Sequence, residues 1–188
     1  MYTRSMEIKN KKFLYYALFS FLAGTLLCVA LKPHGLTAND GLSYFGVFKS
    51  TIIPYAIALL LPSFFFLRIG LELETKKHKQ LKLVFFFFSL LMLGLAITPY
   101  NLNSFIYALH TTMGSMLFAS QLLVTGIMAI ESKDHSLIRY FWMIELVAGI
   151  VSALYLAPSK GYLLEYQTVF QIFFSLILVS YFTEKREQ

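Results

Sequence analysis

Residues 83–97 of the chain read LVFFFFSLLMLGLAI, an almost unbroken apolar stretch. A membrane β-strand would show apolar and polar residues in alternation over about ten positions, and this stretch shows none. In hydrocarbon every backbone polar group must be satisfied, which an isolated segment achieves only as an α-helix. The stretch therefore predicts a transmembrane helix.

The rest of the chain repeats this pattern. Of its 188 residues 57% are hydrophobic and 14% are charged, which leaves too little polar surface to cover a soluble domain of this length. About 20 apolar residues cross a bilayer, and short polar breaks separate six such runs. We predict an all-α, six-helix integral membrane bundle forming one domain over residues 13–182, between tails at 1–12 and 183–188. The expected spans are 13–31, 50–67, 83–98, 104–130, 140–156 and 166–182.

The basic residues predict the orientation. With six spans, only Lys32, Lys49 and Lys160 of the 16 Lys and Arg residues fall on one side of the membrane. Cytoplasmic loops carry the excess of positive charge, so we expect both termini in the cytoplasm. We expect a multi-pass protein of a bacterial plasma membrane. The net charge of +6 then reflects topology and predicts no nucleic-acid partner.

Small residues recur along the first span. Ser20, Gly24 and Cys28 are four positions apart and so share one face of a helix. Small residues let a second helix approach closely, so we interpret them as a packing stripe. Cys28 is the single cysteine, which excludes a disulfide or a metal site built on cysteines.

Polar residues inside the spans indicate which faces point inward. His110, Gly114, Gln121 and Thr125 lie along one face of span four. Glu145 lies deep in span five, where an ionisable side chain facing lipid is costly. Helix rise places Glu145 about 9 Å and Gln121 about 13 Å from the cytoplasmic surface, a difference that long side chains can span. The hypothesis is a buried contact between Glu145 and Gln121.

A second polar group gathers at the outer end. The loop after span one contains Asn39-Asp40-Gly41, which predicts a turn, with Gly35, Gly41 and Gly46 as permissive positions. We expect this loop to fold over the bundle and to form a ligand-binding cavity. The predicted ligand-binding residues are His34, Asn39, Asp40, Ser43, His110, Glu165, Gln167 and Gln171.

Three functions are compatible with these residues. The favoured one is non-enzymatic binding of a membrane lipid or of a partner membrane protein under residues 34–49. The second is a lipid hydrolase or transferase with catalytic candidates His110, Asp40, Ser43 and Glu165, although no spaced hydrolase or metalloprotease motif accompanies them. The third is a small transporter or channel subunit, in which Gln121 and Glu145 continue a polar path from the outer cluster. We predict no metal and no cofactor.

Several spaced residues resemble a known group. Ser43 and Gly46 in GLSYFGVFKSTIIPY, and His110, Gly114 and Phe118 in LHTTMGSMLFASQL, resemble motifs of the DRAM-like six-helix membrane proteins. That group joins autophagy modulators to fungal sterol-suppressor proteins and related bacterial membrane proteins. Glu145 and the segment GYLLEYQ resemble its glutamate positions. The acidic residue that often follows the loop serine is missing here. The resemblance implies a six-helix bundle tied to lipid handling or membrane organisation, without a catalytic mechanism.

Overall fold

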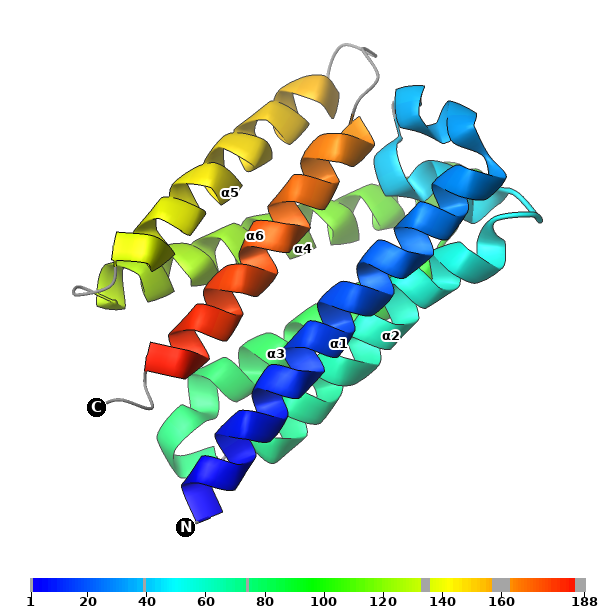
Figure 1. Cartoon of the computed structure of the whole chain (residues 1–188). Coiled ribbons are helices and arrows are strands. Elements are labelled where there is room, and N and C mark those ends of the chain that lie inside the picture. Colours follow the sequence, from blue (N-terminus) through cyan, green and yellow to red (C-terminus); the bar gives the residue numbers. More distant parts are fainter. Residues whose placement is uncertain (1, 39, 74, 133–135, 157–162, 185–188) are drawn as a thin grey trace.

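The described part of the computed structural model contains six long helices and two short ones. The structure describes all residues except 1, 39, 74, 133–135, 157–162 and 185–188. The long helices are α1 (Tyr2–Leu31), α2 (Ile52–Glu72), α3 (Thr75–Ile97), α4 (Ser104–Glu131), α5 (Ser136–Leu156) and α6 (Leu163–Glu184). The 3-10 helices η1 (Pro33–Thr37) and η2 (Gly41–Val47) join α1 to α2 (Figure 1). All six long helices are long and apolar enough to span a membrane, which confirms the predicted fold class.

The chain returns to one end of the bundle, as an even number of crossings requires. Figure 1 shows both termini at the end opposite to η1 and η2. Helices α1, α2 and α3 form one half of the bundle, and α4, α5 and α6 form the other. Helix α1 packs against α6, and α3 packs against α4, to join the halves. Which end faces the cytoplasm stays a prediction from the charge asymmetry; we call the end with η1 and η2 the outer end.

The helices extend beyond the expected spans. Helix α3 begins at Thr75 and includes Lys79 and Lys82, which we expected in the loop between spans two and three. Lysine is a good helix former, and outside the hydrocarbon its charge carries no penalty. Helix α1 likewise includes most of the predicted tail, because it begins at Tyr2.

The small-residue stripe of α1 faces α2. Ser20, Gly24 and Cys28 are all buried. A Cβ atom placed on Gly24 would lie 2.7 Å from the backbone nitrogen of Ala58 and from the carbonyl oxygen of Pro54. No side chain fits there, so Gly24 sets the closest approach of the two helices, as the packing interpretation predicted.

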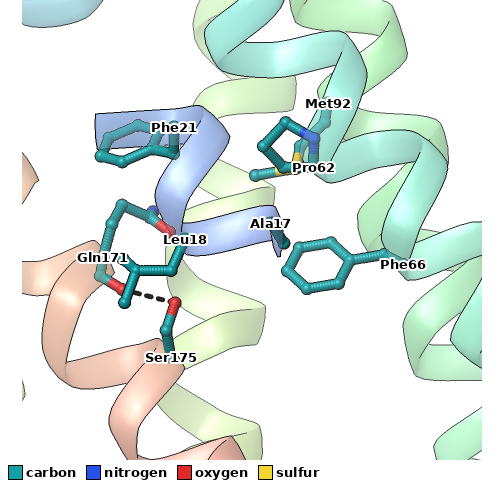
Figure 2. A pocket seen from close by; sticks show the side chains of 8 residues that line it. All are labelled: Ala17, Leu18, Phe21, Pro62, Phe66, Met92, Gln171 and Ser175. Carbon is teal, nitrogen blue, oxygen red and sulfur yellow. Dashed lines mark hydrogen bonds between the residues drawn. The ribbon is translucent and has the colours of Figure 1, made fainter. Parts of the chain in front are cut away.

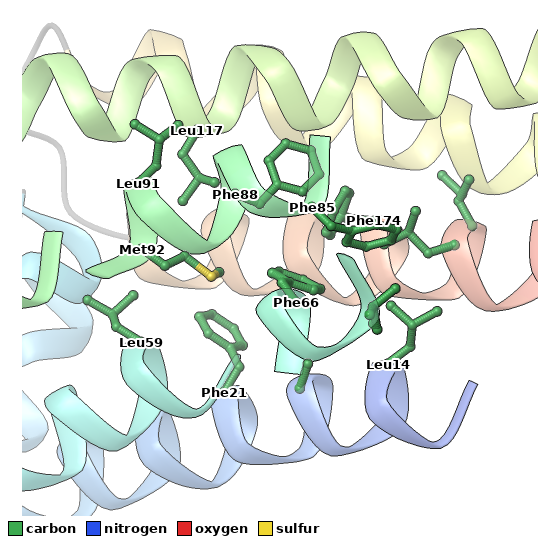
Figure 3. Packing of buried hydrophobic residues seen from close by; sticks show 14 of the residues in the cluster. Leu14, Phe21, Leu59, Phe66, Phe85, Phe88, Leu91, Met92, Leu117 and Phe174 are labelled. Atoms are coloured by element: carbon green, nitrogen blue, oxygen red, sulfur yellow. The ribbon is translucent and has the colours of Figure 1, made fainter. Parts of the chain in front are cut away.

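A cluster of aromatic side chains joins the two halves. Phe66 of α2, Phe88 of α3 and Phe174 of α6 have ring centroids 5.6 to 6.2 Å apart (Figure 3). Phe88 and Phe174 are fully buried and Phe66 nearly so. Such inclined ring pairs add roughly 0.5–1.5 kcal/mol each beyond area burial. In lipid, such packing is one of the forces that hold helices together, along with interhelical hydrogen bonds.

Prolines leave certain backbone carbonyl groups without their helical hydrogen-bond donors. Pro54 lies in the first turn of α2, and Pro62 lies buried inside the same helix. Pro99 follows α3, which ends at Ile97. Since proline has no N–H, Pro99 leaves the Leu95 carbonyl without its helical partner. The Tyr55 hydroxyl of α2 donates to that carbonyl over 3.1 Å, so the freed group ties α2 to α3.

Candidate functional site

The outer end holds a hydrogen-bonded chain of three groups. The Ser43 Oγ atom in η2 lies 2.8 Å from Nε2 of His110 in α4. The other ring nitrogen, Nδ1, lies 2.6 Å from the carbonyl oxygen of Thr98, just beyond α3. His110 is 6% exposed, whereas Ser43 is half-buried. The predicted meeting of the loop serine with the span-four histidine is therefore present.

Local sequence explains why His110 reaches a backbone carbonyl. Asn103 caps α4, because its side-chain oxygen accepts from the Ile106 N–H over 2.9 Å, so α4 starts just after the turn that follows Pro99. Thr98 closes α3 by directing both its N–H and its hydroxyl to the Gly94 carbonyl. Its own carbonyl lies beyond the last turn of α3 and accepts from His110.

This contact fixes the histidine tautomer. A carbonyl oxygen only accepts, so the hydrogen of a neutral His110 ring must be on Nδ1. The Thr98 hydroxyl, 3.3 Å from the same nitrogen, donates to Gly94 and leaves this assignment unchanged. Nε2 then carries a lone pair and accepts a hydrogen bond from the Ser43 hydroxyl.

Gln167 anchors the loop from the other half of the bundle. Its Oε1 atom accepts from the backbone N–H of Leu42 over 3.0 Å. Gly41 precedes this contact with a φ of 54°, and a Cβ there would collide with the Gln167 amide. Gly41 therefore needs to be glycine for two reasons, its backbone conformation and its close approach. By contrast, Gly35 and Gly46 make room for the rings of Phe45 and Tyr55.

The other predicted outer residues have different surroundings. Asp40 is exposed, and its Oδ2 atom accepts from the Tyr100 hydroxyl over 2.9 Å. Burial, and then the bond to Asp40, raise the pKa of Tyr100. His34 is exposed on η1. Glu165 lies in the first turn of α6, and its Oε2 atom has no hydrogen-bond partner within the described residues. Asn39 lies outside the residues that the structure describes.

Gln121 and Gln171 pair with each other, which corrects two expectations. The amide nitrogen of each donates to the side-chain oxygen of the other, over 3.2 and 2.9 Å. Gln171 was expected in the outer cluster, but it lies one turn further along α6 than Gln167 and faces α4. The hypothesis that Gln121 bonds Glu145 is wrong, because the Gln121 amide pairs with Gln171 and neither carboxyl oxygen of Glu145 has a hydrogen-bond partner among the described residues.

Glu145 is fully buried, as its place in span five predicted. Neither carboxyl oxygen has a hydrogen-bond partner among the residues that the structure describes. The Thr125 hydroxyl lies beside the carboxyl, but it donates to the carbonyls of Gln121 and Leu122 in its own helix. A hydrogen-bonded path from the outer cluster through Gln121 to Glu145, which the transporter alternative requires, is therefore not formed in the described part of the chain.

A shallow crevice opens between the two halves. It is lined by apolar side chains of α1, α2 and α3 and by two polar residues of α6 (Figure 2). The lining residues are Ala17, Leu18, Phe21, Pro62, Phe66, Met92, Gln171 and Ser175. The polar groups are occupied, since Ser175 donates to the Gln171 carbonyl and the Gln171 amide bonds Gln121. Among the described residues, no group of three or more His, Cys, Asp or Glu side chains is placed to hold a metal ion.

Fold and spans define a multi-pass helical integral membrane protein. Comparison of the chain with models of protein families, with curated proteins and with solved structures finds no match in any of the three. The resemblance to the DRAM-like group stays a prediction.

Sequence reasoning missed Thr98, Tyr100 and Leu42. Thr98 and Leu42 contribute backbone groups, which no side-chain pattern reveals. Pro99 was the available signal, because a proline after a helix marks where that helix stops and its last carbonyls need other donors.

Proposed function

We propose that the protein binds a membrane lipid, with one acyl chain lying along the shallow crevice between α1, α2, α3 and α6. The observation that carries the proposal is the lining of that crevice. Six of its eight residues are apolar, and Gln171 and Ser175 already use their hydrogen-bonding groups within the protein. The crevice is shallow, with a volume of about 10 Å³, so an acyl chain would lie along it against apolar side chains and would not be enclosed by the protein.

The position differs from the one expected from the sequence. We predicted a polar cavity under residues 34–49, but there the Ser43, His110 and Gln167 side chains bond to neighbouring protein groups. The crevice lies instead around the middle residues of α1, α2 and α6. Lipid acyl chains occupy this depth of a bilayer.

Crosslinking with a lipid analogue tests the proposal. The full chain is reconstituted with a phospholipid carrying a diazirine on its acyl chain, and crosslinked peptides are identified by mass spectrometry. We expect crosslinks within residues 17–21 and 171–175. Leu18→Trp, which fills the crevice, should reduce them severalfold. Leu26→Trp is the matched control, because Leu26 is 67% exposed on the same helix and outside the crevice.

Two results would contradict the proposal. One is crosslinking spread evenly over the lipid-facing residues of all six helices. The other is an equal effect of Leu18→Trp and Leu26→Trp, which would mean that the crevice has no preference over the general lipid-facing surface.

A further inference from the structure

The Ser43 and His110 pair has the geometry of an activated nucleophile. A serine hydroxyl is a weak nucleophile unless a neighbouring base removes its proton, and the base must be held by a third group. Here the base lies 2.8 Å from Oγ, and the Thr98 carbonyl holds the far side of the ring at 2.6 Å. Both distances are within the range for such groups, and the tautomer leaves the lone pair on the side that faces serine.

We propose that Ser43 and His110 are catalytic residues that cleave a carboxylic ester at the outer membrane interface. Ser43 Oγ is the nucleophile and His110 Nε2 is the general base. The Thr98 carbonyl is a positioning group. Asp40, one of the catalytic candidates named from the sequence, accepts a hydrogen bond from Tyr100 and does not contact the pair.

The depth of Ser43 and His110 in the membrane indicates which class of substrate they could reach. Helix α4 has 28 residues and is about 42 Å long, so it exceeds a hydrocarbon core of about 30 Å by several Å at each end. His110 lies six residues from the outer end of α4, about 9 Å along its axis. The pair therefore lies near the hydrocarbon boundary, where ester carbonyls of membrane lipids lie. The choice of a lipid ester rests on the proposed lipid binding; the reactivity of Ser43 does not.

The reaction has two balanced steps. In the first, Oγ bonds to the ester carbonyl carbon, the bond from that carbon to the alcohol oxygen breaks, and His110 moves the serine proton to the departing alcohol. In the second, water attacks the acyl-serine, His110 takes its proton and returns it to Oγ, and a carboxylic acid leaves. Ser43 is half-buried in η2, so the residue is only partly shielded from water.

A fluorophosphonate reagent tests the activation of Ser43 without any lipid. The full chain, purified in mild detergent, is treated with the reagent, and the modified peptide is mapped by mass spectrometry. We expect Ser43 to form a phosphonate ester with loss of fluoride, and Ser43→Ala to abolish labelling. His110→Asn, and His110→Gln as a second variant in case the first fails to fold, should slow labelling about a hundredfold.

Ser50→Ala is the matched control, because Ser50 is an exposed serine on the same outer loop and outside the pair. It should leave labelling unchanged. Wild-type protein that is folded and yet unlabelled at Ser43 would overturn the inference, as would equal labelling of Ser43 and Ser50. If the histidine variants unfold, the labelling of the wild-type protein alone still tests whether Ser43 is activated.

The second arm uses liposomes of phosphatidylcholine with a fluorescent acyl chain. We expect release of the free fatty acid by the wild-type protein and none by Ser43→Ala. Labelling of Ser43 without crevice crosslinking would retain the catalytic pair and reject the lipid-binding proposal. Crevice crosslinking without Ser43 labelling would do the reverse.

Discussion

His110 and Glu145 are two buried ionisable side chains with opposite surroundings. His110 is 6% exposed, and both of its ring nitrogens are hydrogen-bonded. Glu145 is fully buried, and within the described residues neither of its carboxyl oxygens is hydrogen-bonded. The difference follows from the backbone around them. Inside regular helices every N–H is already used, so a carboxylate finds no backbone donor, whereas the end of a helix supplies free carbonyls to an imidazole N–H.

The largest loss of stability is expected for His110→Leu. The substitution leaves the buried Thr98 carbonyl without a donor, which costs about 1–3 kcal/mol. Thermal unfolding of the purified protein in detergent measures it. His34→Leu is the control, because His34 is exposed on the same end, and its effect should be within about 0.5 kcal/mol. Equal effects of the two variants would show that the hydrogen bonds of His110 do not stabilise the protein, and would contradict its contrast with Glu145.

Gly41→Ala should be the next most damaging change. A positive φ costs an alanine about 1–2 kcal/mol, and its Cβ would displace the Gln167 amide from Leu42. We expect a lower unfolding temperature and faster hydrogen exchange at the Leu42 amide. Gly114→Ala is a matched control, since an added Cβ there meets only Leu95, at 3.8 Å. Unchanged exchange at Leu42 in Gly41→Ala would contradict the anchoring role of Gln167.

Glu145→Met should have a smaller effect of the opposite sign. Methionine fills a similar volume without polar atoms, and the substitution removes a buried polar group without a hydrogen-bond partner, whose burial is unfavourable. We expect the free energy of unfolding to stay the same or to rise by about 1 kcal/mol. A loss as large as that of His110→Leu would show that the carboxyl has a partner and that the two sites are alike.

The Gln121 and Gln171 pair should give the smallest effect. Hydrogen bonds between helices in a membrane contribute about 0.6 kcal/mol on average. A double-mutant cycle with Gln121→Leu and Gln171→Leu should give a coupling energy near that value, measured by unfolding in detergent. A coupling of zero would mean that the reciprocal amide contacts contribute nothing beyond the two side chains separately.

The apolar runs were sufficient to predict the fold, because hydrocarbon admits few other arrangements of such a sequence. The site was only partly predictable. The depth of His110 and the position of Ser43 after the first span indicated that they would meet. The depth of a residue in the membrane does not reveal how its helix is rotated about its axis. For this reason we predicted that Gln121 contacts Glu145, whereas it contacts Gln171. Contacts to the backbone, such as those at Thr98 and Leu42, depend on turn geometry that side-chain patterns do not encode.

Pro99 has a consequence for the order in which the chain is assembled. Tyr55, which precedes Pro99 in the chain, satisfies the Leu95 carbonyl, but the donor to the Thr98 carbonyl is His110, in the following helix. When the ribosome has delivered α3 and not yet α4, only one of these carbonyls has its protein partner. The outer end of the first three helices therefore stays incomplete until the fourth helix enters the membrane, and the contact of Leu42 with Gln167 forms only when α6 follows.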